Sequence, residues 1–331
     1  IDQNMADLAA QIAANETGVN ELRKMVQQFG LDVVHAYMTH VQDNAEESVR
    51  RVLDVLDDCS FAYGLDGGAE IKVNISVNRE RREAVIDFTG TSAQQQGNYN
   101  APTAVCRAAV LYVFRTLVND HIPLNDGCLK PLKIVVPPGT MISPEYPAAV
   151  ISGNTEVSQA ITDTLFGALG VLAASQGTMN NFVYGNETYQ NYETICGGTG
   201  AGPDHPGTSG VHSHMTNTRM TDPEVVEWRF PVRLESFGIR DDSGGKGRYA
   251  GGDGVVRSMR FLEPMKATIL SSRREIPPYG LKGGGDGACG HNYVLRSSGE
   301  VVELRGNDEI DLEPDDIFVI ETPGGGGFGK A

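Results

Sequence analysis

The sequence predicts an α+β fold with an N-terminal helical hairpin, a mixed α/β middle and a β-rich, glycine-rich C-terminal half. Three changes of pattern along the chain lead to this prediction. Apolar residues recur at helical spacing up to about residue 56, they alternate with polar residues over 71–88, and helical periodicity fades after about residue 175. These changes predict three domains: a helical hairpin over 1–65, a mixed α/β segment over 66–175 and a β-rich domain over 176–331.

Two helices are expected at the start of the chain. Apolar residues at helical spacing over 5–29 predict the first, with a less regular stretch at 15–18. Gly30 is a suitable stop and Asp32 a suitable N-cap for the second, whose apolar stripe runs over 34–56. Two helices joined by a short glycine turn predict a helical hairpin.

The middle of the chain mixes both kinds of periodicity. Alternation on either side of a charged turn at 79–82 predicts a β-hairpin over 71–88. Residues 103–118 are apolar on nearly every side and predict a buried helix, and 132–136 read as a short strand. A ladder of apolar residues over 157–172 predicts a second core helix, which Asn154 or Thr155 could cap.

The last half of the chain carries short β-like runs separated by glycine-rich turns. Such runs predict an antiparallel sandwich or a barrel-like domain. They lie at 255–261, 267–270, 293–296, 301–304 and 317–320.

Composition and charge restrict the class of function. The net charge is −16 and the pI is about 4.8, so the surface repels phosphate backbones and anionic membranes. The five cysteines are scattered and form no CxxC motif, which argues against a disulfide scaffold or a zinc ribbon and indicates a reducing compartment. No signal peptide or run of 18 apolar residues is visible. We therefore expect a cytoplasmic protein that binds neither nucleic acid nor membrane.

Two glycine-rich stretches, 243–254 and 323–330, invite a nucleotide-binding interpretation. The second spells G-x-x-x-x-G-K, but Ala331 stands where a P-loop places Ser or Thr, and no helix follows to hold the phosphates. Tight turns and close backbone packing explain both stretches better.

The pair His212 and His214 is the clearest candidate for chemistry. At i and i+2 in a strand, two rings share one face, which suits a metal or a paired acid/base role. No third ligand stands at a recognisable spacing, so we favour proton transfer or substrate contact over metal binding. Glu193 and Asp222 are acidic companions nearby in the sequence, and a nucleophile pair of Cys196 with His214 is conceivable. The alternative is a structural histidine pair at a strand edge.

Asparagines beside glycines form three further clusters, at 97–100, 153–156 and 177–181. Such loops can present amides and backbone N–H groups to an oxyanion or carboxylate. The alternative is turn chemistry, because Asn tolerates left-handed backbone and bonds its own backbone; Asn154 could equally be only a helix cap.

Polar, glycine-bounded blocks recur in order along the whole chain. They lie at 7–11, 15–18, 90–94, 100–102, 123–128, 152–156, 175–181, 192–195, 214–218 and 242–245. The final block, 321–329, is the Glu-Thr-Pro-Gly-Gly-Gly-Gly-Phe-Gly run near the end of the chain. Together these blocks resemble the hydantoinase B/oxoprolinase family.

The resemblance implies a B-type subunit that works with an A-type partner. Family members include 5-oxoprolinase, N-methylhydantoinase, caprolactamase and the ketone carboxylases. The A-type subunit binds ATP and phosphorylates the carbonyl or enol oxygen of the substrate, and the B-type subunit helps to complete hydrolysis or carboxylation. The metal-ligand motifs of the family lie upstream of the block at 7–11. We therefore expect a divalent metal in a preceding region, and the metal ligands are not assigned to residues here.

From these features we expect part of an ATP-dependent cyclic-amide hydrolase that acts with an A-type partner. The alternatives are a ketone carboxylase subunit and a non-catalytic assembly scaffold. We expect the candidate residues to line a common cleft. The predicted catalytic residues are His214, His212 and Glu193, and the predicted substrate-binding residues are Asn154, Asn180 and Asn217.

Overall fold

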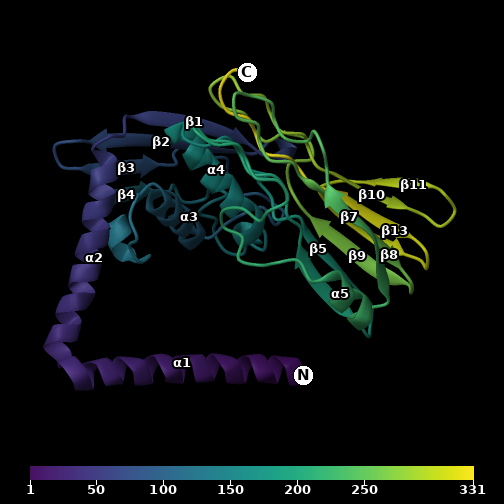
Figure 1. The fold of residues 1–331 in the computed structure, drawn as a ribbon, viewed down its shortest axis with the longest axis horizontal. Coiled ribbons are helices and arrows are strands. Elements are labelled where there is room, and N and C mark those ends of the chain that lie inside the picture. The colour runs from purple at the N-terminus through teal and green to yellow at the C-terminus, as the bar shows by residue number, and fades with distance from the viewer.

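The computed structural model describes residues 1–331, apart from the side chain of Asp2. It confirms the α+β class: two N-terminal helices lead into a helix-covered sheet, and a β-sandwich follows (Figure 1). The buried apolar residues form two clusters, one under the first sheet and one inside the sandwich. Within the described part of the chain, none of the helices combines the length and apolar character that crossing a bilayer requires.

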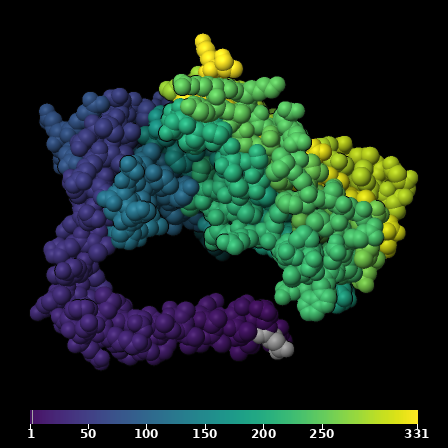
Figure 2. Space-filling model, in the orientation of Figure 1, coloured from purple at the N-terminus to yellow at the C-terminus, as the bar shows by residue number. Residues whose placement is uncertain are grey.

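The two expected N-terminal helices are present, but they do not fold back on each other. Helix α1 (Asp2–Phe29) and helix α2 (Leu31–Leu53) meet at Gly30, whose φ of 83° and ψ of 151° break the helical path. From this point the helices diverge, and α1 stands apart from the body of the protein (Figures 1 and 2). The hairpin prediction was therefore right about the helices and the break, and wrong about their packing.

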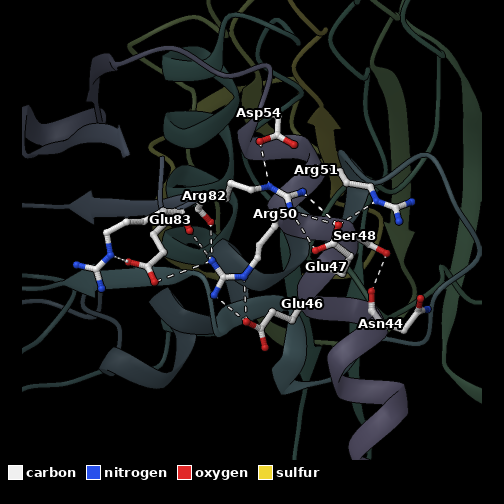
Figure 3. Close-up of polar contacts among 10 residues, drawn as sticks. Asn44, Glu46, Glu47, Ser48, Arg50, Arg51, Asp54, Arg82 and Glu83 are labelled. Carbon is white, nitrogen blue, oxygen red and sulfur yellow. Dashed lines mark hydrogen bonds and ion pairs between the residues drawn. The ribbon is translucent and has the colours of Figure 1, made fainter. Parts of the chain in front are cut away.

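Charged side chains hold the C-terminal half of α2 against the turn between strands β2 (Glu70–Asn78) and β3 (Glu83–Asp87) (Figure 3). Arg50 donates through Nη1 to the carbonyl oxygens of Arg81 at 3.0 Å and Arg82 at 2.8 Å. Arg82 in turn pairs with Glu47 at 3.2 Å and Asp54 at 3.0 Å. The charged turn expected at 79–82 therefore anchors the helix to the sheet.

A four-stranded sheet with order β1-β2-β3-β4 forms the first half of the body. The expected β-hairpin is its centre, and β3 pairs with β4 in parallel. Both expected core helices, α3 and α4, are present, and they pack on each other with α4 against β1 and β2. The elements are β1 (Cys59–Gly64), β2 (Glu70–Asn78), β3 (Glu83–Asp87), α3 (Thr103–Thr116), β4 (Leu132–Val135) and α4 (Ser158–Leu169).

The second half is an antiparallel sandwich, as the sequence predicts. A five-stranded sheet with order β11-β10-β13-β8-β7 faces a four-stranded sheet with order β12-β9-β5-β6. The rings of Phe182 on β5 and Phe318 on β13 lie 4.7 Å apart between the sheets. The elements are β5 (Asn181–Gly185), β6 (Gln190–Thr194), α5 (Pro223–Arg229), β7 (Val232–Ile239), β8 (Val255–Phe261), β9 (Met265–Leu270), β10 (His291–Leu295), β11 (Val301–Leu304), β12 (Asn307–Leu312) and β13 (Ile317–Glu321).

The glycine-rich stretches pack against one another, which confirms the close-packing interpretation. The amide of Gly325 donates to the carbonyl of Gly252 at 2.8 Å, and that of Gly245 donates to the carbonyl of Gly325 at 2.8 Å. A Cβ atom at Gly198 would collide with the backbone of Gly252. Side chains are excluded by this backbone-on-backbone contact, which explains why these segments are glycine.

Candidate functional site

Helix α4 carries a polar face inside an otherwise apolar environment. Glu156, in the π-helical turn Gly153–Val157, is followed at helical spacing by Gln159 and Asp163, and all three are fully buried. Segments 175–181 and 212–216 bond to this face, and segment 271–274 bonds to segment 175–181. We call these three side chains and three segments the α4 seam. It lies where the first half of the body meets the sandwich.

His214 faces Asp163 within the seam. Its Nε2 lies 3.3 Å from Oδ1 of Asp163, although the ring N–H is not aligned for a hydrogen bond. Its Nδ1 lies 3.4 Å from the hydroxyl of Tyr112, and the ring of Phe166 covers it at 5.3 Å. The histidine side chain is only 6% exposed. A protonated imidazole at this position would be paired with a fully buried carboxylate.

The loop that carries His214 is not a strand, so the prediction that His212 and His214 share a strand face was wrong. Only Val211 forms an isolated bridge, with Gly197, and His214 lies in a turn with φ of 49°. The loop is held instead by Gln159, whose Nε2 donates to the carbonyl of Ser213 at 3.1 Å. His212 is half-buried, and burial lowers its pKa.

Asp163 is the centre of a larger cluster. Its Oδ2 accepts from the hydroxyl of Tyr63 at 3.2 Å, and its backbone carbonyl accepts from the hydroxyl of Tyr279 at 2.5 Å. The guanidinium of Arg273 lies over the Tyr63 ring at 3.8 Å. Burial raises the pKa of Tyr63 well above its ordinary value, so its hydroxyl stays a donor to the carboxylate.

Glu156 and Arg274 form the other end of the seam. Oε1 of Glu156 accepts from the backbone of Met179 at 3.0 Å and from Nδ2 of Asn181 at 2.8 Å, while Oε2 has no partner. Burial raises the pKa of this carboxyl. Burial also lowers the pKa of Arg274 to about 10. Two ionisable groups perturbed by burial in one place are typical of a functional site.

Unsatisfied and strained groups concentrate in the same place. Among the described side chains, the buried polar atoms without a hydrogen-bond partner belong to residues 152–176, 212–214 and 272–274, except for those of Tyr184 and Asn191. Three of the non-glycine residues with positive φ, Asn180, His214 and Arg273, also lie here. Such atoms and backbone conformations cost free energy and cluster at active sites. The α4 seam is therefore the candidate site.

The predicted substrate-binding asparagines divide into one buried and two exposed residues. The amide of Asn180 is already engaged, because it donates to Gln176 and to the carbonyl of Ile195 and accepts from Arg274 at 2.8 Å. Asn154 and Asn217 are exposed. Neither Asn154 nor Thr155 caps α4 with its side chain, so the cap prediction was wrong.

Glu193 lies inside the sandwich and not against His214. Arg257 donates to its Oε1 from Nε at 3.1 Å and from Nη2 at 2.9 Å, and to its Oε2 at 3.1 Å. Asp222, the other acidic companion expected for the histidines, caps helix α5 by accepting from the amide of Glu224. Burial raises the pKa of the Cys196 thiol, the opposite of what a thiolate nucleophile needs.

The sequence interpretation missed Asp163 and did not single out Glu156. The signal was present: a carboxylate in the middle of the apolar ladder over 157–172 is out of place unless it is paired. Read in that way, Thr162-Asp163-Thr164 marks a polar stripe on a core helix. The partner of Asp163 could not be predicted, because His214 is 51 residues away in the sequence and no local pattern links the two residues.

Two hollows lie away from the seam. One of about 680 Å³ is lined by residues 56–58 and 77–80, and another of about 400 Å³ lies beside β3 and β4. Among the side chains that the structure describes, no three His, Cys, Asp or Glu residues are grouped to hold a metal ion. Of the predicted site residues, His214 and Asn180 lie in the buried polar cluster, and the exposed Asn154 and Asn217 lie outside it.

Known proteins resemble this chain along its whole length. A family model described as hydantoinase B/oxoprolinase matches residues 1–331. The 5-oxoprolinase of Dictyostelium discoideum is 44% identical over 342 residues, and 5-oxoprolinase 1 of Arabidopsis thaliana is 46% identical over 346 residues. Each match covers 100% of this chain and 27% of the relative, so the chain spans about a quarter of the length of these proteins.

Two solved structures share the fold. The ATP-dependent caprolactamase from Pseudomonas jessenii matches with a TM-score of 0.87 at 21% identity, over 98% of this chain and 61% of that chain. The nucleotide-free acetone carboxylase matches with a TM-score of 0.82 at 16% identity, over 93% of this chain and 50% of that chain.

Proposed function

The chain belongs to the hydantoinase B/oxoprolinase family, and from that premise we propose that it is part of an ATP-dependent cyclic-amide hydrolase. It would supply part of the B-type unit, and an A-type ATP-binding subunit or domain would supply the phosphorylation. Relatives named 5-oxoprolinase at 44% and 46% identity support a small lactam such as 5-oxoproline as the substrate. The five cysteines are all free thiols, which supports a reducing, cytoplasmic setting.

The chemistry that the seam would perform is proton transfer during ring opening. An amide resists water, and phosphorylation of its oxygen makes the carbon open to attack. Water adds to that carbon, and the ring nitrogen must take up a proton before the C–N bond breaks. Ring opening then leaves an acyl phosphate, which a second water hydrolyses to the free carboxylate and inorganic phosphate. An imidazolium held against a buried carboxylate can supply the proton that the ring nitrogen takes up. The His214–Asp163 contact at 3.3 Å is the single observation that carries this proposal.

The direction of proton movement follows from the two ring nitrogens. Because Nε2 of His214 faces Asp163, Nδ1 is the nitrogen left for exchange, and it lies 3.4 Å from the half-buried hydroxyl of Tyr112. Burial raises the pKa of Tyr112, which keeps the hydroxyl protonated and able to relay a proton toward the surface of α3. Burial lowers the pKa of His212, so this imidazole stays neutral and can accept a proton from an attacking water.

The remaining candidates receive different roles in the proposal. Asn154 and Asn217 have exposed amides that are free to contact the substrate. Asn180 holds the seam together through Gln176 and Arg274, and we assign it a structural role. Glu193 is also assigned a structural role, because Arg257 occupies both of its oxygens.

No step of the proposal runs through a metal or nucleotide on this chain. Among the described side chains no three ligands are grouped to hold a metal ion, and the glycine-rich stretches bond one another's backbone. In the proposal, other parts of the assembled enzyme bind the ATP and the divalent metal.

The test is a substitution in the complete enzyme, with ATP hydrolysis and lactam opening measured separately. We expect His214→Gln to slow ring opening about 100- to 10,000-fold, the usual contribution of a general acid. ATP hydrolysis should continue, because phosphorylation precedes the blocked step. His291→Gln is the matched control, since His291 is exposed on β10 and paired with Glu303. Unchanged ring opening in His214→Gln and in His212→Gln would point to an assembly scaffold instead. Labelled bicarbonate entering a ketone would identify a carboxylase.

A further inference from the structure

Three side chains on one face of helix α4 hold the turn that carries His214. Gln159, Asp163 and Phe166 stand at i, i+4 and i+7, so they lie above one another along the helix. Asp163 faces the imidazole at 3.3 Å, and the ring of Phe166 covers it at 5.3 Å. Gln159 instead bonds the main chain of the turn. Two of the three side chains therefore contact the ring, and the third contacts the backbone that carries it.

Gln159 makes two hydrogen bonds to the turn. Its Nε2 donates to the carbonyl oxygen of Ser213 at 3.1 Å and to the hydroxyl oxygen of Thr216 at 3.0 Å. Because a carbonyl oxygen only accepts, the amide nitrogen of Gln159 must be the atom that faces the turn. The same carbonyl of Ser213 accepts from the backbone amide of Thr216 at 3.2 Å. Gln159 is thus bonded to the first and the last residue of the four-residue turn 213–216.

The turn needs this support because its backbone is strained. His214 is its second residue and has a φ of 49°, in the left-handed region that costs free energy for a residue with a side chain. The direction of the imidazole depends on this angle. Relaxation to a negative φ would move the ring away from Asp163 and from the hydroxyl of Tyr112, which lies 3.4 Å from Nδ1. The bonds from Gln159 oppose that relaxation.

The burial of Gln159 makes its presence costly to the fold. The side chain is 0% exposed, and its Oε1 has no hydrogen-bond partner among the described atoms. A buried acceptor without a partner lowers stability. An apolar side chain would suit this part of α4, since the buried residues around it include Val157, Ala160, Ile161 and Leu165. A polar side chain that breaks the local rule of burial is typical of a functional site.

We propose that Gln159 is a positioning residue for ring opening, an inference that rests on the proposed function. By fixing the turn 213–216, it sets the imidazole of His214 between Asp163 on α4 and Tyr112 on α3. Gln159 acts through His214 and does not itself touch the reacting atoms. A catalytic group displaced by about 1 Å loses about 100-fold in rate. Loss of the Gln159 bonds should therefore slow ring opening and leave lactam binding unchanged.

Gln159→Met in the complete enzyme tests this role, because it keeps the length of the side chain and removes the donor. We expect kcat for ring opening to fall about 100-fold, with the KM for the lactam unchanged and ATP hydrolysis continuing. Thr164→Val is the matched control: Thr164 is equally buried in α4, but its hydroxyl bonds the carbonyl of Ala160 within the helix at 2.6 Å. It should keep the parent kcat. A parent kcat in Gln159→Met, or equal losses in both variants, would overturn the proposal.

A double variant shows whether Gln159 acts through His214. Residues that act as a unit have non-additive effects, so Gln159→Met with His214→Gln should open the lactam no more slowly than His214→Gln alone. Slowing by the product of the two single effects would overturn the role of Gln159 and leave proton transfer by His214 intact. Unchanged ring opening in His214→Gln would instead overturn the proposed function, and the role of Gln159 with it.

Substitutions at Thr216 test the same contact and do not depend on whether Gln159→Met folds. Thr216→Val removes the hydroxyl that accepts from Gln159, whereas Thr216→Ser keeps it. Because one of the two bonds to the turn remains, Thr216→Val should lower kcat for ring opening by about tenfold, a smaller loss than in Gln159→Met. Thr216→Ser should retain the parent kcat. Equal rates of ring opening in the valine and serine variants would overturn the proposal.

Discussion

The buried ion pair between Arg257 and Glu193 permits the sharpest prediction about stability. Glu193→Gln keeps the size and shape of the side chain but removes its charge. The side chains of Arg257 and Glu193 are only 2% and 0% exposed, and three hydrogen bonds join them. The substitution leaves a guanidinium in the sandwich core without a counter-charge. Breaking a buried pair in this way costs about 3–5 kcal/mol.

Urea unfolding of the parent and variant chains measures this cost. The matched control is Glu309→Gln, which breaks the Lys266–Glu309 pair on the surface, where both side chains are 56% exposed. An exposed pair of this kind contributes less than about 1 kcal/mol. Equal losses in the two variants would refute the description of Arg257 and Glu193 as a buried, mutually dependent pair.

A double substitution then separates structure from catalysis. Replacing both partners, as Glu193→Leu with Arg257→Met, removes both buried charges and should restore most of the lost stability. If Glu193 is structural, the folded double variant still opens the lactam in the complete enzyme. Loss of ring opening in a folded double variant would indicate that Glu193 has a catalytic role.

Three further predictions concern the seam and the contact between α2 and the β2–β3 turn. Burial raises the pKa of Glu156 above 4.5, so the fold favours the protonated acid and stability falls as pH rises through the raised pKa. Glu156→Gln should remove this dependence of the free energy of unfolding on pH, measured by urea unfolding from acid to neutral pH. An unchanged pH dependence would contradict the prediction. Gly177→Ala adds a methyl group 2.7 Å from the Tyr63 hydroxyl at a φ of +65°. It should lower the free energy of unfolding by about 1–3 kcal/mol more than Gly67→Ala, because Gly67 also has positive φ but has open space around it. Equal losses of stability would refute the crowding at Gly177. Arg50→Met removes the donors to the carbonyls of 81 and 82 and should speed hydrogen exchange in that turn, whereas unchanged protection would show that the anchor is redundant.

The elements of the fold were predictable because their signals are local. The alternation over 71–88 and the ladder over 157–172 each report which face of one element is buried, and both elements are present in the structure. The direction in which α1 leaves Gly30 was not predictable, since it depends on one pair of backbone angles. A short glycine turn fits a packed hairpin and an open bend equally well.

The site was predictable only in part, because burial and pairing are not local. His214 stands out by its neighbours in the sequence, but its partner Asp163 comes from a helix that reads as core. Glu193 lies close to the histidines in sequence, but in the structure it pairs with Arg257 on the facing sheet. The turn at His214, with φ of 49°, also replaced the expected strand. Residue chemistry therefore singled out a histidine that lies in the seam and an acid that lies outside it.

We propose that the His214–Asp163 pair transfers a proton during ring opening. The most direct measurement is the ratio of ATP hydrolysed to lactam opened by the complete enzyme carrying Asp163→Asn, compared with the parent enzyme. We predict that this ratio rises, because a neutral amide cannot support proton transfer by His214 as the carboxylate does, so ring opening slows while ATP hydrolysis continues. A folded Asp163→Asn enzyme with the parent ratio would contradict this proposal.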